Sequence, residues 1–281
     1  MKYLFQWAAF GSALLTAAIF VILYLLSLPL LSQGTLWTVL WQPWDPQHGS
    51  FGIYPMVVTS LSSAFVAVAI STPLCFGCAL FITQYGPRNI RRWMLNLVRL
   101  MGSIPTVVYG FTALFLLVPR MREALGGSGL NIATASLILA LLIAPTLILF
   151  FVDSITQSSQ RDCHTVTALG GTRAQVIRHA VLPQAWPGLV NGILLGLGRA
   201  MGDTLISLML AGNSVQTPDA LTDSARTLTA HIALVIAADV ASLEFRSLFA
   251  CAIVLYLFSA LLVIGVRWIN HSQPLSQRRM L

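Results

Sequence analysis

The hydrophobic residues of this chain fall into six long runs separated by more polar segments. Each run holds around twenty residues or more, which is the length that an α-helix needs to cross a hydrocarbon layer of ~30 Å. The pattern predicts an all-α membrane protein with six transmembrane helices and one transmembrane domain, residues 1–281. The predicted spans are about 8–31, 54–83, 94–118, 132–152, 189–210 and 249–269.

The most polar interruption, residues 153–187, separates the fourth and fifth runs and is too hydrophilic to lie in lipid. We expect it to form two short helices that are separated by Gly170 and Gly171. Thr172 and Gln175 have the T-x-x-Q spacing of a capping box, which places the start of the second helix at Thr172.

Pro183 is expected to end this second helix, because proline has no amide hydrogen to donate and disfavours helix in the residue before it. The helical pair carries the basic residues Arg173, Arg178 and His179. A bent polar pair between two spans should lie along the cytoplasmic surface, so we expect a partner to dock there.

The composition supports a polytopic membrane protein. Of 281 residues, 57% are hydrophobic and only 9% are charged, and the mean hydropathy is +0.80. A net charge of +7 would suggest nucleic-acid binding in a soluble protein, but here the positive-inside rule explains it and no nucleic-acid partner is expected. Ten Lys and Arg residues lie on the side of the termini and of residues 153–187, and four lie on the other side. Both termini are therefore predicted to be cytoplasmic.

Several classes of chemistry are disfavoured. Lys2 is the only lysine, so the chain lacks a P-loop, and any ATP hydrolysis must occur in another polypeptide. Cys75 and Cys78 lie inside an apolar run, where small packing residues are expected rather than a redox pair. His231 has no second ligand at metal spacing, so we expect neither a metal site nor an enzyme.

The first outer loop and a later apolar segment are expected at the membrane surface. Trp37, Trp41 and Trp44 stand in a loop without basic residues, as in an aromatic belt at the headgroups. Residues 228–241 are apolar but too short to span, so we expect a re-entrant or interfacial helix there.

The third run contains Pro105 among the polar residues Ser103, Thr106 and Tyr109. Such a break is either a packing kink or a place where a transporter helix lines a cavity. Arg99 precedes the proline by six residues, about 9 Å along a helix. It either extends to the cytoplasmic headgroups or lines a pathway.

The fifth run carries Arg199 and Asp203 at i and i+4, where they would share a helix face and could pair. A charge near the bilayer centre costs at least ~2.5–3.5 kcal/mol, so the two favour a functional site over a salt bridge that merely ties helices together. Thr204 adds a hydroxyl donor. Asp203 could compete for Arg199 and so weaken an anion site enough for release. Gly192 and Gly196 help to make one side of this helix small, which permits close packing.

Residues 163–188 resemble the EAA loop of ABC-importer permeases. Ala168-Leu169-Gly170, followed at the same spacing by Leu182-Pro183, is similar to that loop, although the triplet begins with His164 in place of the acidic residue. The resemblance implies a coupling helix that fits a groove on an ATPase. The residues it implies in coupling are His164, Ala168, Leu169, Gly170, Gly171, Arg173, Leu182 and Pro183.

Three further segments resemble permeases of phosphate importers, and in particular their C-type subunit. They are residues 51–55 (FGIYP), 103–110 (SIPTVVYG) and 196–204 (GLGRAMGDT). The family usually has an acidic residue where Arg99 stands and Glu where Asp203 stands. The resemblance implies the type I importer permease fold, and a substrate pathway of Arg199, Asp203, Thr204, Arg99, Ser103, Thr106 and Tyr109.

The same resemblance implies the partners and the location. They are a second related permease, two cytoplasmic ATPases that bind ATP and Mg, a periplasmic substrate-binding protein, and the bacterial inner membrane. The substrate would be phosphate or a similar oxyanion, for which an arginine fork is well suited. The alternatives are a permease for molybdate, tungstate or sulfate, and a membrane scaffold or channel subunit without transport.

Overall fold

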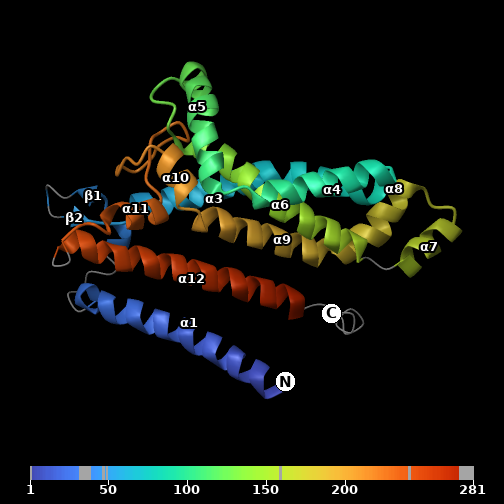
Figure 1. Cartoon of the computed structure of the whole chain (residues 1–281), viewed down its shortest axis with the longest axis horizontal. Helices are drawn as coiled ribbons and strands as arrows, with labels where there is room; N and C mark the ends of the chain where they lie inside the picture. The colour runs from blue at the N-terminus through green and yellow to red at the C-terminus, as the bar shows by residue number, and fades with distance from the viewer. Residues whose placement is uncertain are drawn as a thin grey trace.

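The computed structural model describes residues 2–31, 39–45, 48, 50–157, 160–239 and 242–271. It is built almost entirely of helices (Figure 1). The long helices are α1 (Lys2–Leu31), α3 (Tyr54–Leu80), α4 (Arg88–Ser103), α5 (Thr106–Leu125), α6 (Ile132–Thr156), α9 (Leu182–Gly202) and α12 (Leu243–His271). The shorter elements are the strands β1 (Trp44–Asp45) and β2 (Ser50–Phe51), the π-helical turns η2 (Phe81–Tyr85) and η3 (Ile177–Val181), and the helices α7 (Gln160–Ala168), α8 (Arg173–Val176), α10 (Leu205–Leu210) and α11 (Leu228–Val235).

Among these described helices, five are long and apolar enough to cross a membrane, or six if the bent pair α4 and α5 counts as one span. The predicted all-α membrane fold is therefore confirmed, and the small β1–β2 hairpin is an addition to it. The N-terminal end of α1 and the C-terminal end of α12 both lie on the side of the molecule that holds α7 and α8 (Figure 1).

The core is formed by α6, which packs between α3 and α9. Its side chains Ile143, Leu147 and Phe151 are completely or almost completely buried. The helix begins at Asn131, whose side chain accepts a hydrogen bond from the Thr134 amide at 2.8 Å and so satisfies one of the free donors of the first turn. In contrast, α1 contacts mainly α12, and its apolar side chains are exposed, as expected for a helix that faces lipid.

Glycines allow the close approach of α9 to α6. A Cβ atom at Gly192 would lie 3.1 Å from Phe151 Cε1, and one at Gly196 would lie 3.1 Å from Leu147 Cδ2. Both contacts are tighter than ordinary packing, so the small side of α9 that the sequence predicts is the side that meets the core.

Overfilling this interface should destabilise the protein. Gly192→Leu is expected to lower the stability of the purified chain by about 1–3 kcal/mol, because the added side chain would collide with Phe150 and Phe151. Thermal unfolding in detergent measures the effect. Gly77→Leu is the matched control, since a Cβ atom on this exposed glycine meets nothing within 4 Å. Equal loss of stability in both variants would contradict close packing at Gly192.

The third predicted span is not a single kinked helix. It is broken into α4 and α5, which meet at an angle of 92°, and α5 projects from the side of the bundle (Figure 1). Ile104 has an extended backbone (ψ 129°), as the residue before a proline usually does, and α5 restarts after Pro105. The Tyr109 hydroxyl donates to the Met101 carbonyl at 2.9 Å, so its side chain fastens the two halves across the bend.

The β1–β2 hairpin and α11 lie at the end of the molecule opposite α7 and α8 (Figure 1). Trp44 is buried there, edge-to-face against His231 at 4.6 Å between ring centroids, so the prediction that Trp44 belongs to an interfacial belt is wrong. Trp41 is exposed and stacks on Tyr54, and Trp37 lies outside the described residues. The hydrophobic contacts of Trp44 outweigh its tendency to lie at headgroups.

His231 is a packing residue, as the sequence indicates. It is fully buried, and its Nε2 lies 3.0 Å from the Ser247 hydroxyl. Burial, with a smaller effect of the positive charge of Arg226, lowers the pKa of His231 to about 4. The ring is therefore neutral at pH 7 and can take part in a buried hydrogen bond.

The predicted helical pair at the other end of the molecule is present. α7 ends at Ala168, Gly170 and Gly171 form the turn, and Gln175 Oε1 accepts the Thr172 amide at 2.7 Å in the expected capping box. Pro183 does not end the second helix, however, because η3 and α9 continue it without a gap. The Leu182 amide bonds to the Ile177 carbonyl five residues earlier, as in a π-helical turn, and Pro183 follows this turn as the second residue of α9.

Candidate functional site

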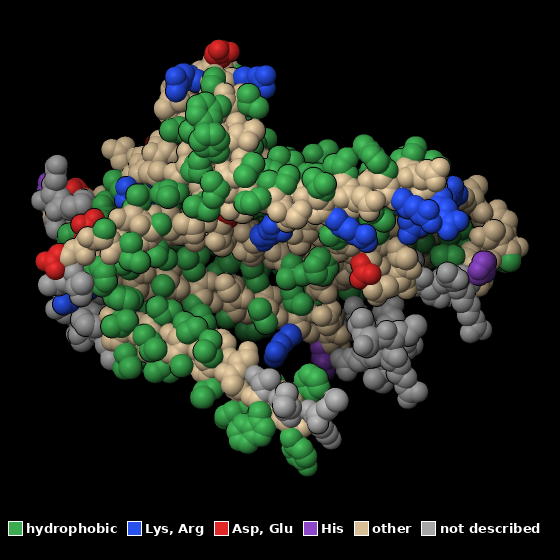
Figure 2. Space-filling view, viewed as in Figure 1, with side chains coloured by type: hydrophobic (Ala, Val, Ile, Leu, Met, Phe, Trp, Pro, Cys, Tyr) green, Lys and Arg blue, Asp and Glu red, His purple; other side chains and the backbone are tan. Residues whose placement is uncertain are grey.

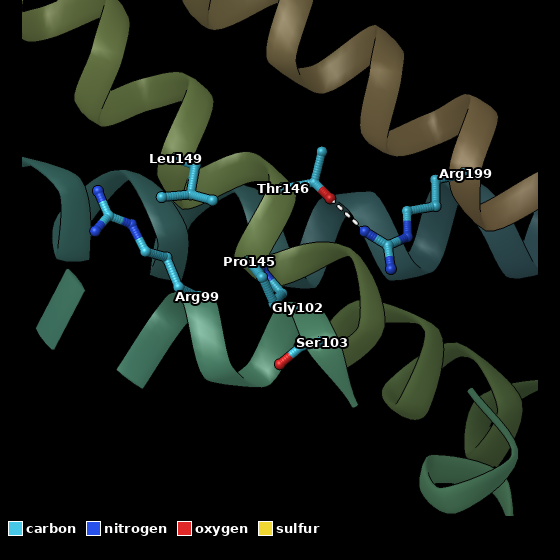
Figure 3. A pocket seen from close by; sticks show the side chains of 7 residues that line it. All are labelled: Arg99, Gly102, Ser103, Pro145, Thr146, Leu149 and Arg199. Carbon is cyan, nitrogen blue, oxygen red and sulfur yellow. Dashed lines mark hydrogen bonds between the residues drawn. The ribbon is translucent and has the colours of Figure 1, made fainter. Parts of the chain in front are cut away.

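A pocket of about 340 Å³ lies between the end of α4, the middle of α6 and the last turns of α9. Two arginines from different helices line it, with small or uncharged residues between them. The lining residues are Arg99, Gly102 and Ser103 of α4, Pro145, Thr146 and Leu149 of α6, and Arg199 of α9 (Figure 3).

Arg199 lies on one side of this pocket. Its Nη1 donates a hydrogen bond to the Thr146 hydroxyl at 2.6 Å. This bond joins α9 to α6 through two residues that are 53 positions apart in the sequence. A guanidinium group carries five N–H donors, so this single bond to a neutral partner leaves donors and the full positive charge facing the pocket. Thr146 fixes the direction of the side chain without neutralising it.

Arg99 lies at the other end of the same pocket. The two guanidinium groups are separated by Gly102, Pro145 and Thr146 (Figure 3), and both arginine side chains are exposed. In this view the Arg99 guanidinium points away from Arg199, although both side chains line the pocket. The pocket therefore carries two positive charges, which favour an anionic ligand over a cationic one.

The α4 and α6 backbones come close at this pocket. A Cβ atom on Gly102 would lie 3.6 Å from the Pro145 Cβ. Ser103 donates its hydroxyl to the Leu100 carbonyl at 2.8 Å, and in Figure 3 its side chain points away from Arg199. Ser103 is therefore part of the wall, and its hydroxyl donor is already used within α4.

Asp203 does not pair with Arg199, which corrects the helical-face prediction. α9 ends at Gly202, and Asp203 has an extended backbone (ψ 124°), so the i, i+4 relation does not exist. The Asp203 carboxylate instead accepts the Ile206 amide at 2.8 Å and caps the first turn of α10. Aspartate favours such capping over the middle of a helix, which explains the break. Among the described residues no ion pair joins Asp203 to Arg199.

The capping role of Asp203 can be tested by two variants, one that removes only the charge and one that also removes the acceptor oxygen. Asp203→Asn keeps an oxygen that can accept the Ile206 amide, whereas Asp203→Ala removes it. We expect Asp203→Ala to lose about 0.5–2 kcal/mol of stability and Asp203→Asn to lose a few tenths at most. Thermal unfolding of the two variants decides the matter. A loss of equal size in both would show that the charge, and not the hydrogen bond, is what stabilises this segment.

The remaining predicted pathway residues stand outside the pocket lining. Thr106 begins α5, Tyr109 fastens the α4–α5 bend, and Thr204 precedes α10. The Thr229 hydroxyl donates to the Asp203 carbonyl at 3.0 Å, so α11 also supports this break. Thr146 and Leu149 line the pocket but are not among the residues predicted from the sequence. A hydroxyl directly after Pro145 inside a span was the one available signal.

The predicted coupling residues gather at the end of the molecule that holds α7 and α8. His164, Ala168, Leu169 and Gly170 are exposed, and Leu169 is 84% exposed although its side chain is apolar. Lys and Arg side chains form a dense cluster at the start of α4 beside α8 (Figure 2).

The other coupling residues differ in exposure. Leu182 packs partly against the core, whereas Pro183 is exposed. The Arg173 guanidinium lies over the ring of Tyr85, with 5.1 Å between its Cζ and the ring centroid.

These features match those of known proteins. Residues 71–273 match the family described as binding-protein-dependent transport system inner membrane component. This chain belongs to that family. The resemblance to ABC-importer permeases that the sequence analysis describes is therefore confirmed.

Individual members of the transport family are similar over most of the chain. The probable ABC transporter permease protein YqgH of Bacillus subtilis (strain 168) is 30% identical over 82% of this chain and 75% of its own length. The phosphate transport system permease protein PstC of Pasteurella multocida (strain Pm70) is 30% identical over 68% of this chain and 66% of its own length. PstC of Mesorhizobium japonicum is 29% identical over 81% of this chain and 76% of its own length.

Solved structures support the permease fold. The MetNI methionine ABC transporter in inward-facing conformations has a chain that matches with a TM-score of 0.56 at 21% identity, over 78% of this chain and 94% of that chain. A bacterial ABC transporter involved in alginate import matches with a TM-score of 0.55 at 18% identity, over 92% of this chain and 93% of that one. The fold is thus that of the type I ABC-importer permeases.

Proposed function

We propose that this chain is the transmembrane subunit of an ATP-driven importer that carries inorganic phosphate across the bacterial inner membrane. The observation that carries the proposal is the pocket in which Arg99 and Arg199, from two different helices, flank one small space. The names of the PstC relatives point to the same substrate.

The chemistry of the pocket suits a tetrahedral oxyanion. Phosphate carries one to two negative charges and four oxygens, and a guanidinium group offers paired donors that fit two of these oxygens. Among the described residues Arg199 makes one side-chain hydrogen bond, to Thr146, and Arg99 adds a second positive charge. Among the described residues that line this pocket none is acidic, so an entering anion meets two positive charges and no lining carboxylate.

The exposed end formed by α7 and α8 is proposed to dock an ATPase. Leu169 presents an almost fully exposed apolar side chain in the turn between α7 and α8, and a partner surface would cover it. In this proposal two ATPase subunits bind ATP and Mg, and this chain binds neither. A second related permease completes the pore, a periplasmic binding protein delivers the anion, and both termini are cytoplasmic.

Uptake competition tests the substrate. Cells that lack other phosphate importers and express the complete transporter should take up labelled phosphate, with an excess of unlabelled phosphate competing and sulfate, molybdate and tungstate not competing. Transport of another of these oxyanions in place of phosphate would contradict the proposed substrate but keep the importer. A chain that supports no ATP-dependent uptake of any of them, although an ATPase co-purifies with it, would contradict transport itself.

A further inference from the structure

One contact joins the proposed coupling segment to a helix that is remote from it in sequence. Arg173 is the first residue of α8, and its guanidinium lies 5.1 Å from the ring centroid of Tyr85, the last residue of η2. Both side chains are exposed to solvent. An arginine over an aromatic face is a cation–π contact, which holds the two elements together without burying either.

Tyr85 stands directly before α4. Only Gly86 and Pro87, both extended, separate it from the helix, and the Gly86 amide bonds to the Phe81 carbonyl at 2.6 Å. Pro87 has a fixed φ and leaves little freedom in this connection. From this start α4 runs about 16 Å to Arg99 at the pocket, by the rise of an ideal helix. A displacement of Tyr85 is therefore passed to one wall of the pocket.

Arg173 stands at the start of the other wall. α8, η3 and α9 follow one another without a gap, and α9 runs about 26 Å from Leu182 to Arg199. The Arg173–Tyr85 contact thus joins the starts of the two helical segments that carry the two pocket arginines. π-Helical turns stand beside both contact residues, η2 ending at Tyr85 and η3 following α8, and such turns often occur where helices must adjust.

We propose that Arg173 and Tyr85 form a second mechanical link from the coupling segment to the pocket. It passes movement of α8 to α4, while the covalent connection through η3 passes the same movement to α9. Arg99 and Arg199 then shift together, so the pocket changes shape when the ATPase moves α8. This inference rests on the proposed docking of an ATPase at α7 and α8, and it assigns Arg173 and Tyr85 as positioning residues that do not touch the anion.

The expected effect is moderate. An exposed cation–π contact has a strength that corresponds to about a two- to fivefold change in an equilibrium. Loss of the link should leave ATP hydrolysis intact and lower the amount of phosphate transported per ATP by about this factor. The covalent connection remains, so transport does not stop.

The test uses the complete transporter reconstituted in lipid vesicles, with phosphate uptake and ATP hydrolysis measured together. Tyr85→Leu removes the aromatic face and should lower the ratio of phosphate to ATP two- to fivefold, whereas Tyr85→Phe and Tyr85→Trp keep a face and should match the parent protein. Arg173→Gln should lower the ratio similarly. The double variant should have the same ratio of phosphate to ATP as whichever single variant has the lower ratio, because both changes remove the same contact.

Three results would overturn the link. They are an unchanged ratio in Tyr85→Leu, a defect in Tyr85→Phe equal to that in Tyr85→Leu, and a double variant whose defect is the product of the two single defects. The last outcome would mean that Arg173 acts through the ATPase alone.

A second readout does not depend on the substrate. Asn96 is exposed on α4, one turn before Arg99. In a background with Cys78 and Cys163 replaced by serine, Asn96→Cys should react with a water-soluble maleimide at a rate that changes when ATP and vanadate are added. Tyr85→Leu should diminish this change, and a full change in Tyr85→Leu would also overturn the link. Failure of phosphate transport with a preserved, Tyr85-dependent change would instead contradict the proposed substrate.

Discussion

Arg199→Ala is expected to reduce phosphate uptake by at least about thirtyfold while the chain still inserts into the membrane. In the proposed pore Arg199 and the bound anion form a charge pair enclosed between the permease subunits, and truncating one partner of a buried charge pair costs about 2–5 kcal/mol, of which the lower value corresponds to this factor. Arg199 lines the pocket, and its only described side-chain hydrogen bond is to the neutral Thr146 hydroxyl. The positive charge is therefore available to an incoming anion. Initial rates of labelled phosphate uptake, normalised to the amount of permease in the membrane, measure the effect.

Two matched variants separate this role from general damage. Arg199→Lys keeps the charge but loses the planar pair of donors, so an intermediate loss is expected. Arg120→Ala removes an exposed arginine of α5 that does not line the pocket, and uptake should stay normal. Normal uptake by Arg199→Ala at normal abundance would refute the placement of this side chain in the pathway.

Local signals in the sequence predicted the local structure well. The turn at Gly170 and Gly171 and the capping box of Thr172 with Gln175 both depend on residues within a few positions of each other, and both are present. The transmembrane runs were equally clear, because the length of an apolar segment is a property of the sequence itself.

Helix breaks were harder to predict because competing local preferences decide them. An unbroken apolar run suggested that Arg199 and Asp203 share a helix, but the carboxylate caps α10 and the helix stops. Similarly, Pro105 indicated a kink in the third run, but not a bend of 92° with a Tyr109–Met101 hydrogen bond across it. Pro183 is the opposite case. It was predicted to end a helix, but it lies inside a continuous helical segment, just after the π-helical turn η3.

Contacts between distant segments could not be predicted from spacing. The Arg199–Thr146 hydrogen bond and the Arg173–Tyr85 contact each join helices far apart in sequence. The sequence predicted that Arg99 and Arg199 are candidates for a substrate pathway. It did not predict that both line the same pocket. The packing of α4 and α9 against α6 decides that arrangement.

The turn between α7 and α8 has a backbone that only certain residues can adopt. Gly170 has φ +81°, in the left-handed region. Its amide bonds to the Thr167 carbonyl and that of Gly171 bonds to the Val166 carbonyl, both at 3.0 Å. These two bonds are the pattern of a Schellman motif, which ends a helix and turns the chain sharply. The angle between α7 and α8, and so the shape offered to an ATPase, depends on this turn.

Gly170→Val is therefore expected to lower ATP-driven phosphate uptake by about tenfold, since a left-handed L-residue costs roughly 1–2 kcal/mol and β-branching adds to the strain. Gly170→Asn is the matched control, because asparagine tolerates this conformation and a Cβ atom there meets nothing within 4 Å. Co-purification of the ATPase and its phosphate-stimulated ATP turnover should fall with Gly170→Val and persist with Gly170→Asn. If both variants assemble and turn over ATP like the parent, the bend between α7 and α8 does not position the ATPase, and coupling must run through another surface.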